Sequence, residues 1–187
     1  MKHLILIGGP MGIGKTTACK ALAAMLPNNV FLDGDWCWNM RPFTVNEETK
    51  QMVMDNITFL LSSFLHCSAY ENVIFCWVMH EQEIVDEILR RLPLESVCVH
   101  PISLVGSERA LAARISYDIA QGLRTPDAIG RSLSYLSKYE TLSTVKLDVS
   151  DLTPEQTAKR LAQIVSDSDY DFHHDDCNRK EHSNHFK

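Results

Sequence analysis

The sequence lacks the features that mark membrane, secreted and nucleic-acid-binding proteins. No apolar run is long enough to cross a bilayer, because the longest one, near residues 57–65, is broken by Ser62 and Ser63. The formal net charge is −6, so the composition gives no indication of bulk nucleic-acid binding. The N-terminus passes directly into an apolar, strand-like segment, which leaves no room for a signal peptide. We therefore expect a cytoplasmic protein without a membrane or nucleic-acid partner.

The cysteines also lack the paired spacing of zinc sites. The six thiols are scattered, mostly in apolar segments: Cys19, Cys37, Cys67, Cys76, Cys98 and Cys177. This pattern is typical of reduced, buried thiols in a cytoplasmic protein.

Aliphatic residues almost disappear after residue 165, where Asp, His, Ser, Asn and Lys dominate. Such a segment cannot bury enough apolar surface to order itself. We therefore predict one α/β domain over residues 1–165 and a polar, disordered tail over residues 166–187. A metal site in the tail is the alternative, because it contains several potential ligands: His173, His174, Asp175, Asp176, Cys177, His182 and His185.

Residues 4–17 contain an apolar run, a glycine-rich turn and a helix-like segment in succession. Gly9 and Gly14-Lys15-Thr16 occupy the fixed positions of a phosphate-binding P-loop. Glycines let backbone N–H groups point at a phosphate chain, and the next helix adds the positive end of its dipole. A glycine-rich turn without a ligand is the alternative.

The P-loop interpretation assigns roles to individual residues. We expect Lys15 to face solvent in the empty loop and to neutralise the β- and γ-phosphates of ATP, and Thr16 to ligate Mg²⁺. The residues predicted to bind ATP are Gly9, Met11, Gly12, Ile13, Gly14, Lys15, Thr16, Thr17 and Arg114.

Strands and helices alternate along the chain. Apolar runs predict strands over residues 4–7, 30–32, 73–79, 97–105 (interrupted at Pro101) and 144–149. Helical spacing and capping residues predict helices over residues 15–26, 46–65, 81–91, 107–114, 125–139 and 153–165. This alternation is typical of a parallel sheet between helices, with ligands at the carboxyl ends of the strands.

Two aspartates follow the second strand, with only Gly34 between them. Alternate residues that leave a strand point the same way, so both carboxylates can face the phosphates. We predict that Asp33 holds Mg²⁺ through water and that Asp35 accepts a proton from a substrate hydroxyl. A plain Asp-Gly turn is the alternative. The third strand lacks the terminal aspartate of a Walker B motif, which shifts the metal role to this pair and weakens a generic ATPase interpretation.

Candidate acceptor contacts follow the same two strands. Residues 36–43 hold two tryptophans, a phenylalanine and an arginine, which suit a partly planar acceptor that could be anionic. We name Trp38 and Arg41 from this segment, His80 after the third strand, and Asp35 as substrate-binding residues. Core packing of one tryptophan and a surface position for His80 are the alternatives.

Four arginines lie between the fourth and fifth strands, around a segment, 119–125, that could be a mobile flap. Kinases need cations over the transferring phosphoryl group, and we predict that Arg124 is the catalytic one. Arg114 could lie against the adenine or the phosphates. Arg109 is expected to be a solvated helix residue, and for Arg131 both interpretations stay open.

The P-loop, the Leu32–Asp35 string, the arginine region and the turn at residues 149–154 resemble the small P-loop kinases. These include shikimate, gluconate, adenylylsulfate and nucleoside monophosphate kinases, and antibiotic phosphotransferases built on that fold. The resemblance implies a three-layer α/β fold with a lid and a parallel five-stranded sheet in the order 2-3-1-4-5. It also implies an acceptor-binding helical region near residues 46–65 and an adenine site beside residues 149–154. The glycine triplet of shikimate kinases and the histidine-rich lid of gluconate kinases are missing.

The expected function is transfer of the ATP γ-phosphoryl group to a small molecule, such as a nucleoside, nucleotide, sugar acid or antibiotic, by a monomer or homodimer. A P-loop hydrolase or switch without such an acceptor is the alternative, and a non-catalytic binding protein is a third. The paired aspartates favour the kinase, the missing Walker B aspartate disfavours the hydrolase, and intact Lys15 and Thr16 disfavour the binding protein.

Overall fold

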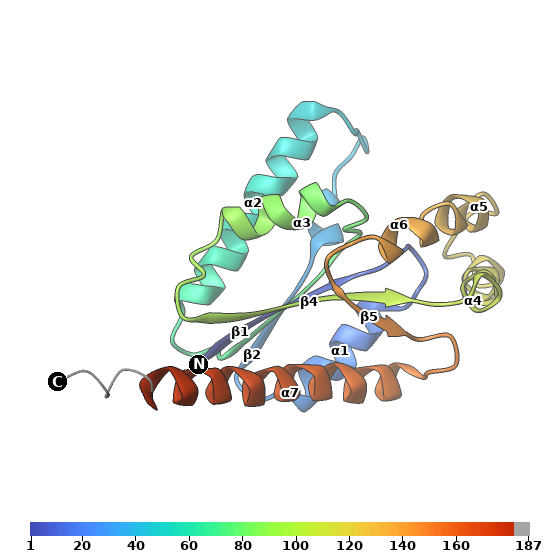
Figure 1. The fold of residues 1–187 in the computed structure, drawn as a ribbon. Helices are drawn as coiled ribbons and strands as arrows, with labels where there is room; N and C mark the ends of the chain where they lie inside the picture. The colour runs from blue at the N-terminus through green and yellow to red at the C-terminus, as the bar shows by residue number, and fades with distance from the viewer. Residues whose placement is uncertain (182–187) are drawn as a thin grey trace.

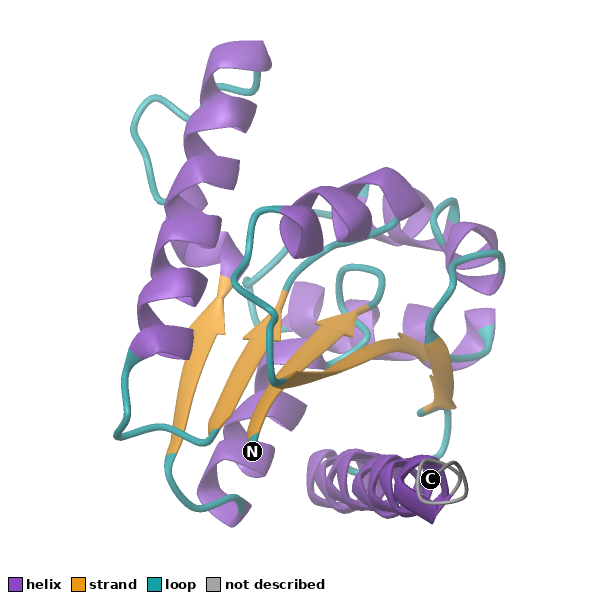
Figure 2. Cartoon of the chain, turned by 60° about the vertical axis from the view of Figure 1, so that its left-hand side comes forward, coloured by secondary structure: helices purple, strands orange, loops and turns teal. Residues whose placement is uncertain are grey.

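The chain forms one parallel sheet covered by helices on both faces (Figures 1 and 2). The computed structural model describes residues 1–181, with side chains described through residue 167. The sheet order is β2-β3-β1-β4-β5, which confirms the predicted topology. The strands are β1 (Lys2–Gly8), β2 (Asn29–Asp33), β3 (Asn72–Cys76), β4 (Val97–Val105) and β5 (Val145–Asp148). The helices are α1 (Lys15–Met25), the 3₁₀ helix η1 (Gly34–Trp38), α2 (Glu47–His66), α3 (Gln82–Arg90), α4 (Glu108–Ala120), α5 (Ala128–Leu133), α6 (Leu136–Glu140) and α7 (Pro154–Glu181).

Two hydrophobic clusters lie on opposite faces of the sheet. Because side chains alternate along a strand, Ile5 and Ile7 of β1 point into one cluster and Leu4 and Leu6 into the other. The first cluster is completed by α1, α4 and α7, and the second by α2 and α3. The central strands are therefore buried on both faces, as their continuous apolar runs predict.

The fourth strand is not interrupted at Pro101, contrary to expectation: β4 runs unbroken from Val97 to Val105. It pairs with β1 over residues 97–103, whereas β5 pairs with it only from Ile102 onward. At Pro101 the strand therefore has a partner on one side only, where a missing N–H can be tolerated.

The region between β4 and β5 differs from the prediction in its helix boundaries. α4 continues past Arg114 to Ala120, so residues 119 and 120 belong to a helix rather than a flap. The helix predicted over 125–139 is two short helices, and the first starts after Asp127 because Thr125 and Ala128 form a turn instead. Between the two helices lies Tyr135.

The last helix begins at the predicted capping box. Thr153 Oγ1 accepts from the Gln156 N–H, and the Gln156 side chain accepts from the Thr153 N–H. The helix then continues to Glu181, beyond the predicted end near Val165. The potential metal ligands of the tail lie outside the side chains that the structure describes, so both interpretations of the tail stay predictions. Within the described residues, none of the helices combines the length and apolarity needed to span a membrane.

Candidate functional site

Residues 9–14 connect β1 to α1 and take a backbone path that depends on glycine. Gly9, Gly12 and Gly14 have φ angles of 149°, 82° and 105°, which side-chain-bearing residues rarely adopt. A Cβ at Gly12 would lie 2.5 Å from Ile115 Cγ1, and one at Gly9 would lie 2.9 Å from the Leu104 carbonyl oxygen. The loop is thus pressed against α4 and β4, and it opens toward the carboxyl ends of the strands.

Lys15 is buried, which corrects the expectation that it faces solvent. Its side chain is 9% exposed, and its Nζ donates to the carbonyl oxygens of Gly9 at 2.9 Å and Pro10 at 3.0 Å. Burial lowers the pKa of Lys15, while Asp35 and Asp33 nearby oppose that shift. The carbonyls supply the polar partners that a buried amine requires. To contact a phosphate on this loop, Lys15 would have to exchange these carbonyls for phosphate oxygens.

Asp33 joins the end of β2 to the first turn of α1. Its Oδ2 accepts from the Thr16 hydroxyl at 2.6 Å, and its Oδ1 accepts from the Asp35 backbone N–H at 3.1 Å. The second bond caps η1, so the chain coils after Asp33 instead of continuing as a strand. Gly34 is required here, since a Cβ would lie 2.6 Å from the Trp77 ring. The Asp-Gly turn is thus a structural cap that also holds a carboxylate beside the P-loop.

Asp35 lines the pocket in front of the P-loop. Asp35 is exposed, but desolvation by the surrounding protein atoms and the neighbouring Asp33 carboxylate still raise its pKa, while Lys15 and Arg124 act in the opposite direction. A carboxylate with a raised pKa is a better proton acceptor than an ordinary one. The environment of Asp35 therefore suits the role predicted for it.

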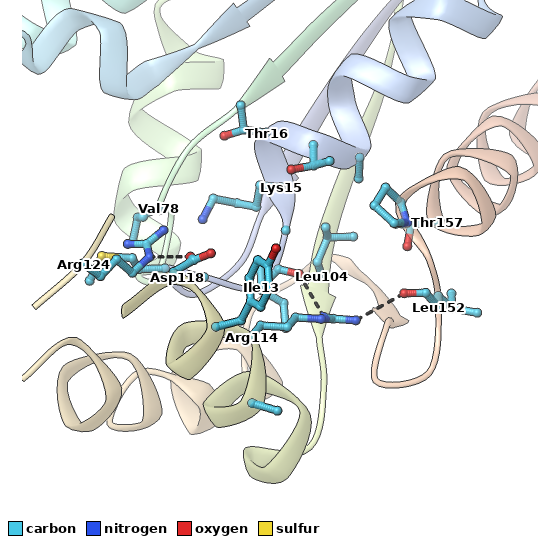
Figure 3. A pocket seen from close by; sticks show the side chains of 18 of the residues that line it. Ile13, Lys15, Thr16, Val78, Leu104, Arg114, Asp118, Arg124, Leu152 and Thr157 are labelled. Carbon is cyan, nitrogen blue, oxygen red and sulfur yellow. Dashed lines mark hydrogen bonds and ion pairs between the residues drawn. The ribbon is translucent and has the colours of Figure 1, made fainter. Parts of the chain in front are cut away.

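A single pocket of about 820 Å³ extends along both sides of the P-loop (Figure 3). Lys15 lies between its two ends. At one end lie Arg114, Leu152 and Thr157, and at the other lie Val78, Asp118 and Arg124. Of the predicted ATP-binding residues, those that line the pocket are Met11, Gly12, Ile13, Gly14, Lys15, Thr16, Thr17 and Arg114, whereas Gly9 contributes its carbonyl to Lys15.

Arg114 forms part of the pocket wall and ties three segments together. Its guanidinium donates to the carbonyl oxygens of Ile13 at 3.0 Å, Val149 at 2.5 Å and Leu152 at 3.3 Å. These bonds join the P-loop to the turn after β5, which is the turn expected to border the adenine.

Arg124 lines the opposite end and is held by a carboxylate. Its Nε lies 2.8 Å from Asp118 Oδ2, and both side chains are partly buried. Asp118, which the sequence interpretation missed, stands in the last turn of α4, where the helix dipole disfavours a negative charge. An acidic residue at the C-terminal end of a helix is unfavourable, and this feature of the sequence could have indicated a functional role for Asp118.

Of the four predicted substrate-binding residues, only Asp35 lines this pocket. Trp38 packs against Phe43 with ring centroids 5.9 Å apart, and Arg41 is exposed on the same segment. His80 contacts the Tyr135 ring edge-on at 4.5 Å, and Tyr135 itself lines the pocket. His80 therefore reaches the site only through a tyrosine that the sequence did not single out.

The remaining lid arginines also lie outside this pocket. Arg131 Nε pairs with Asp127 Oδ2 at 2.9 Å on the surface, and Arg109 is exposed, as predicted. The five cysteines with described side chains form no disulfide bonds with one another, and two of them are buried.

Comparisons with known proteins agree with this geometry. A family profile described as AAA domain matches residues 5–119. The chain is similar to the tunicamycin resistance protein of Deinococcus radiodurans (TM-score 0.65, 16% identity), with 88% of this chain and 96% of that one covered. It is also similar to a gluconokinase from Sinorhizobium meliloti (TM-score 0.65, 19% identity, 92% and 97% covered). A shikimate kinase from Acinetobacter baumannii has a TM-score of 0.59 at 18% identity, with 90% and 94% covered. The sequence has no significant match among curated proteins.

Proposed function

Because this chain belongs to the AAA domain family, whose P-loop implies nucleotide binding, we propose that it transfers the γ-phosphoryl group of ATP to a small molecule. The observation that carries this proposal is the continuity of the pocket. The space in front of Lys15 continues past the P-loop to Asp35, Asp118 and Arg124. A nucleotide on the loop would leave a carboxylate and a cation beyond its last phosphate, where an acceptor can bind.

The chemistry follows from these positions. An acceptor hydroxyl oxygen attacks the γ-phosphorus, the bond from that phosphorus to the bridging oxygen breaks, and ADP leaves with the bridging oxygen. The hydroxyl proton passes to Asp35, whose raised pKa suits proton acceptance. Lys15 and Arg124 stabilise the charge on the transferring group from two sides.

Mg²⁺ is the metal that this site fits. Within the described residues, no cluster of three or more histidine, cysteine or acidic side chains could hold a metal by itself. The Thr16 hydroxyl and Asp33 carboxylate oxygens instead lie 2.6 Å apart, so Thr16 could ligate Mg²⁺ directly while Asp33 holds it through water, and Mg²⁺ characteristically combines few protein oxygens with water and phosphate. When bound there, Mg²⁺ would supply charge neutralisation for the β- and γ-phosphates.

A phosphorylation screen tests the proposal. The full chain is incubated with Mg-ATP and a panel of nucleosides, nucleotides, sugar acids and aminoglycosides, and both ADP and phosphorylated product are measured. We expect ADP release to depend on one class of acceptor, with one phosphorylated product formed per ADP. Fast ADP release without any phosphorylated product would contradict the proposal and favour the hydrolase alternative.

A further inference from the structure

Among the residues whose side chains the structure describes, none offers a free cation to an anionic substrate at the acceptor end of the pocket. Among the described residues that line the pocket, three are cationic: Lys15, Arg114 and Arg124. Lys15 lies under the P-loop, where ATP phosphates would engage it, and Arg114 donates to backbone carbonyls at the opposite end. Arg124 remains, and Asp118 balances its charge at 2.8 Å.

Carboxylates outnumber cations at this end. Asp35 and Asp118 stand against the single guanidinium of Arg124, which leaves one negative charge in excess. If Arg124 moves onto the transferring phosphoryl group, as its proposed role requires, Asp118 loses its partner. The acceptor then faces two carboxylates in a partly desolvated pocket, where like charges repel more strongly than in water.

Basic residues on nearby elements are paired elsewhere or lie away from the pocket. Lys138 lies 5.2 Å from the Tyr135 ring centroid but is 3.1 Å from Glu81 Oε1. Arg131 pairs with Asp127, and Arg41 is exposed outside the pocket lining. None of these three, as the structure describes them, supplies the counter-charge that a carboxylate or phosphate on the acceptor would need.

We propose that the acceptor is an alcohol without a negative charge, and that Asp118 excludes anionic alcohols by pairing with Arg124 and, once Arg124 moves to the phosphoryl group, by its own negative charge. This inference rests on the proposed phosphotransfer and narrows its substrate class. An anionic group at this end would lose hydration without gaining a cation, and it would be repelled by Asp35. The Tyr135 ring, held edge-on by His80, offers the acceptor an aromatic wall instead.

Binding of matched alcohols tests the charge preference without requiring turnover. The full chain, with Mg²⁺ and a non-hydrolysable ATP analogue, is titrated with pairs that differ by one anionic group: uridine and uridine monophosphate, glucose and gluconate, and an aminoglycoside and its phosphorylated form. We expect an uncharged or amine-bearing member to bind at least about tenfold tighter than its anionic partner. Equal or tighter binding of an anionic member would overturn the proposal, and so would failure of every non-anionic member to bind.

The Asp118→Asn variant tests the proposed cause. Removing the carboxylate charge frees Arg124, so binding of the anionic members should strengthen by about threefold or more relative to their partners. Asp127→Asn is the matched control, because it breaks an arginine–carboxylate pair outside the pocket and should leave the preference unchanged. An unaltered preference in Asp118→Asn would contradict the role of Asp118.

Product formation with ATP separates the two proposals. Preferential binding of non-anionic alcohols without phosphorylated product would remove the phosphotransferase proposal while the charge preference stands. Preferential phosphorylation of an anionic alcohol would support the phosphotransferase proposal and overturn the proposed charge preference.

Discussion

The Thr16 hydroxyl donates to Asp33 Oδ2 at 2.6 Å, and this bond joins the first turn of α1 to the end of β2. It holds the two oxygens at the mouth of the P-loop, and Asp35 follows Asp33 by two residues. Because Asp33 is buried and also caps η1, its carboxylate cannot turn away from the loop without breaking both bonds.

Replacement of Asp33 by asparagine should weaken Mg²⁺ binding without unfolding the chain. The asparagine oxygen can still accept from the Asp35 N–H, but the charge that attracts the ion is lost. We expect the Mg²⁺ concentration for half-maximal turnover to rise about 10- to 100-fold, with activity recovering at high Mg²⁺. An unchanged Mg²⁺ dependence would show that Asp33 serves only as a cap.

The Lys15→Ala variant should lose both ATP affinity and turnover, the latter by about 10²- to 10³-fold, because the cation that faces the phosphates is removed. Lys20→Ala is the matched control, since Lys20 is exposed on the same helix. Calorimetry with Mg-ATP distinguishes them, and unchanged affinity in Lys15→Ala would exclude phosphate binding by this loop. The melting temperature of each variant establishes that the fold survives.

The Asp35→Asn variant should lose turnover without losing stability. Turnover of the unmodified chain should rise with pH as Asp35 loses its proton, at a pH above the usual range for an aspartate. The turnover of the variant should lack this rise with pH and should be about 10²- to 10⁴-fold lower. Because the folded-state pKa is raised, the stability linked to this group is present at low pH and is lost as the pH rises through the raised value. The variant should therefore be at least as stable as the unmodified chain at neutral pH. A marked fall in melting temperature, or unchanged turnover, would contradict this role.

The Arg124→Ala variant should have an acceptor-stimulated turnover about 10³-fold lower than that of the unmodified chain, because a cation on the transferring phosphoryl group is lost. Arg131→Ala is the control, since Arg131 forms an equivalent pair with Asp127 outside the pocket. The correct acceptor should also protect residues 121–125 from proteolysis in the unmodified chain. Acceptor-independent hydrolysis that Arg124→Ala leaves unchanged would support the hydrolase alternative.

Gly12→Ala should destabilise the P-loop. The new Cβ would meet Ile115 Cγ1 at 2.5 Å while the backbone keeps a φ of 82°, and we expect a loss of about 1–3 kcal/mol in the free energy of unfolding. Gly130→Ala is the control, because apart from its chain neighbours and the nearby backbone of α5, no described atom lies within 4 Å of the position that its methyl carbon would take. Urea unfolding of both variants checks this, and equal stability would show that the loop can relax away from α4.

Much of the fold follows from interactions between residues close in sequence. The glycine spacing at residues 9–14, the continuous apolar strands and the Thr153–Gln156 capping box each act within one turn or one strand. Alternation of these elements then leaves a parallel sheet as the arrangement that buries both strand faces. The P-loop, the parallel sheet and the position of Asp33 beside the P-loop were therefore predictable, whereas the order of the strands was implied by the resemblance to the small P-loop kinases.

Other properties of the site depend on how segments far apart in the sequence pack together, and interactions between neighbouring residues do not determine that packing. Lys15 is buried because the carbonyls of the P-loop lie over its side chain. The charge of Arg124 is balanced by Asp118 because the turn after α4 brings the two side chains together. Trp38 and Arg41 follow Asp35 within six residues, yet η1 directs the chain away from the pocket. The charges that an acceptor meets thus depend on how α4, η1 and the P-loop pack together, because electrostatic interactions act through space between atoms that only the folded chain brings near one another.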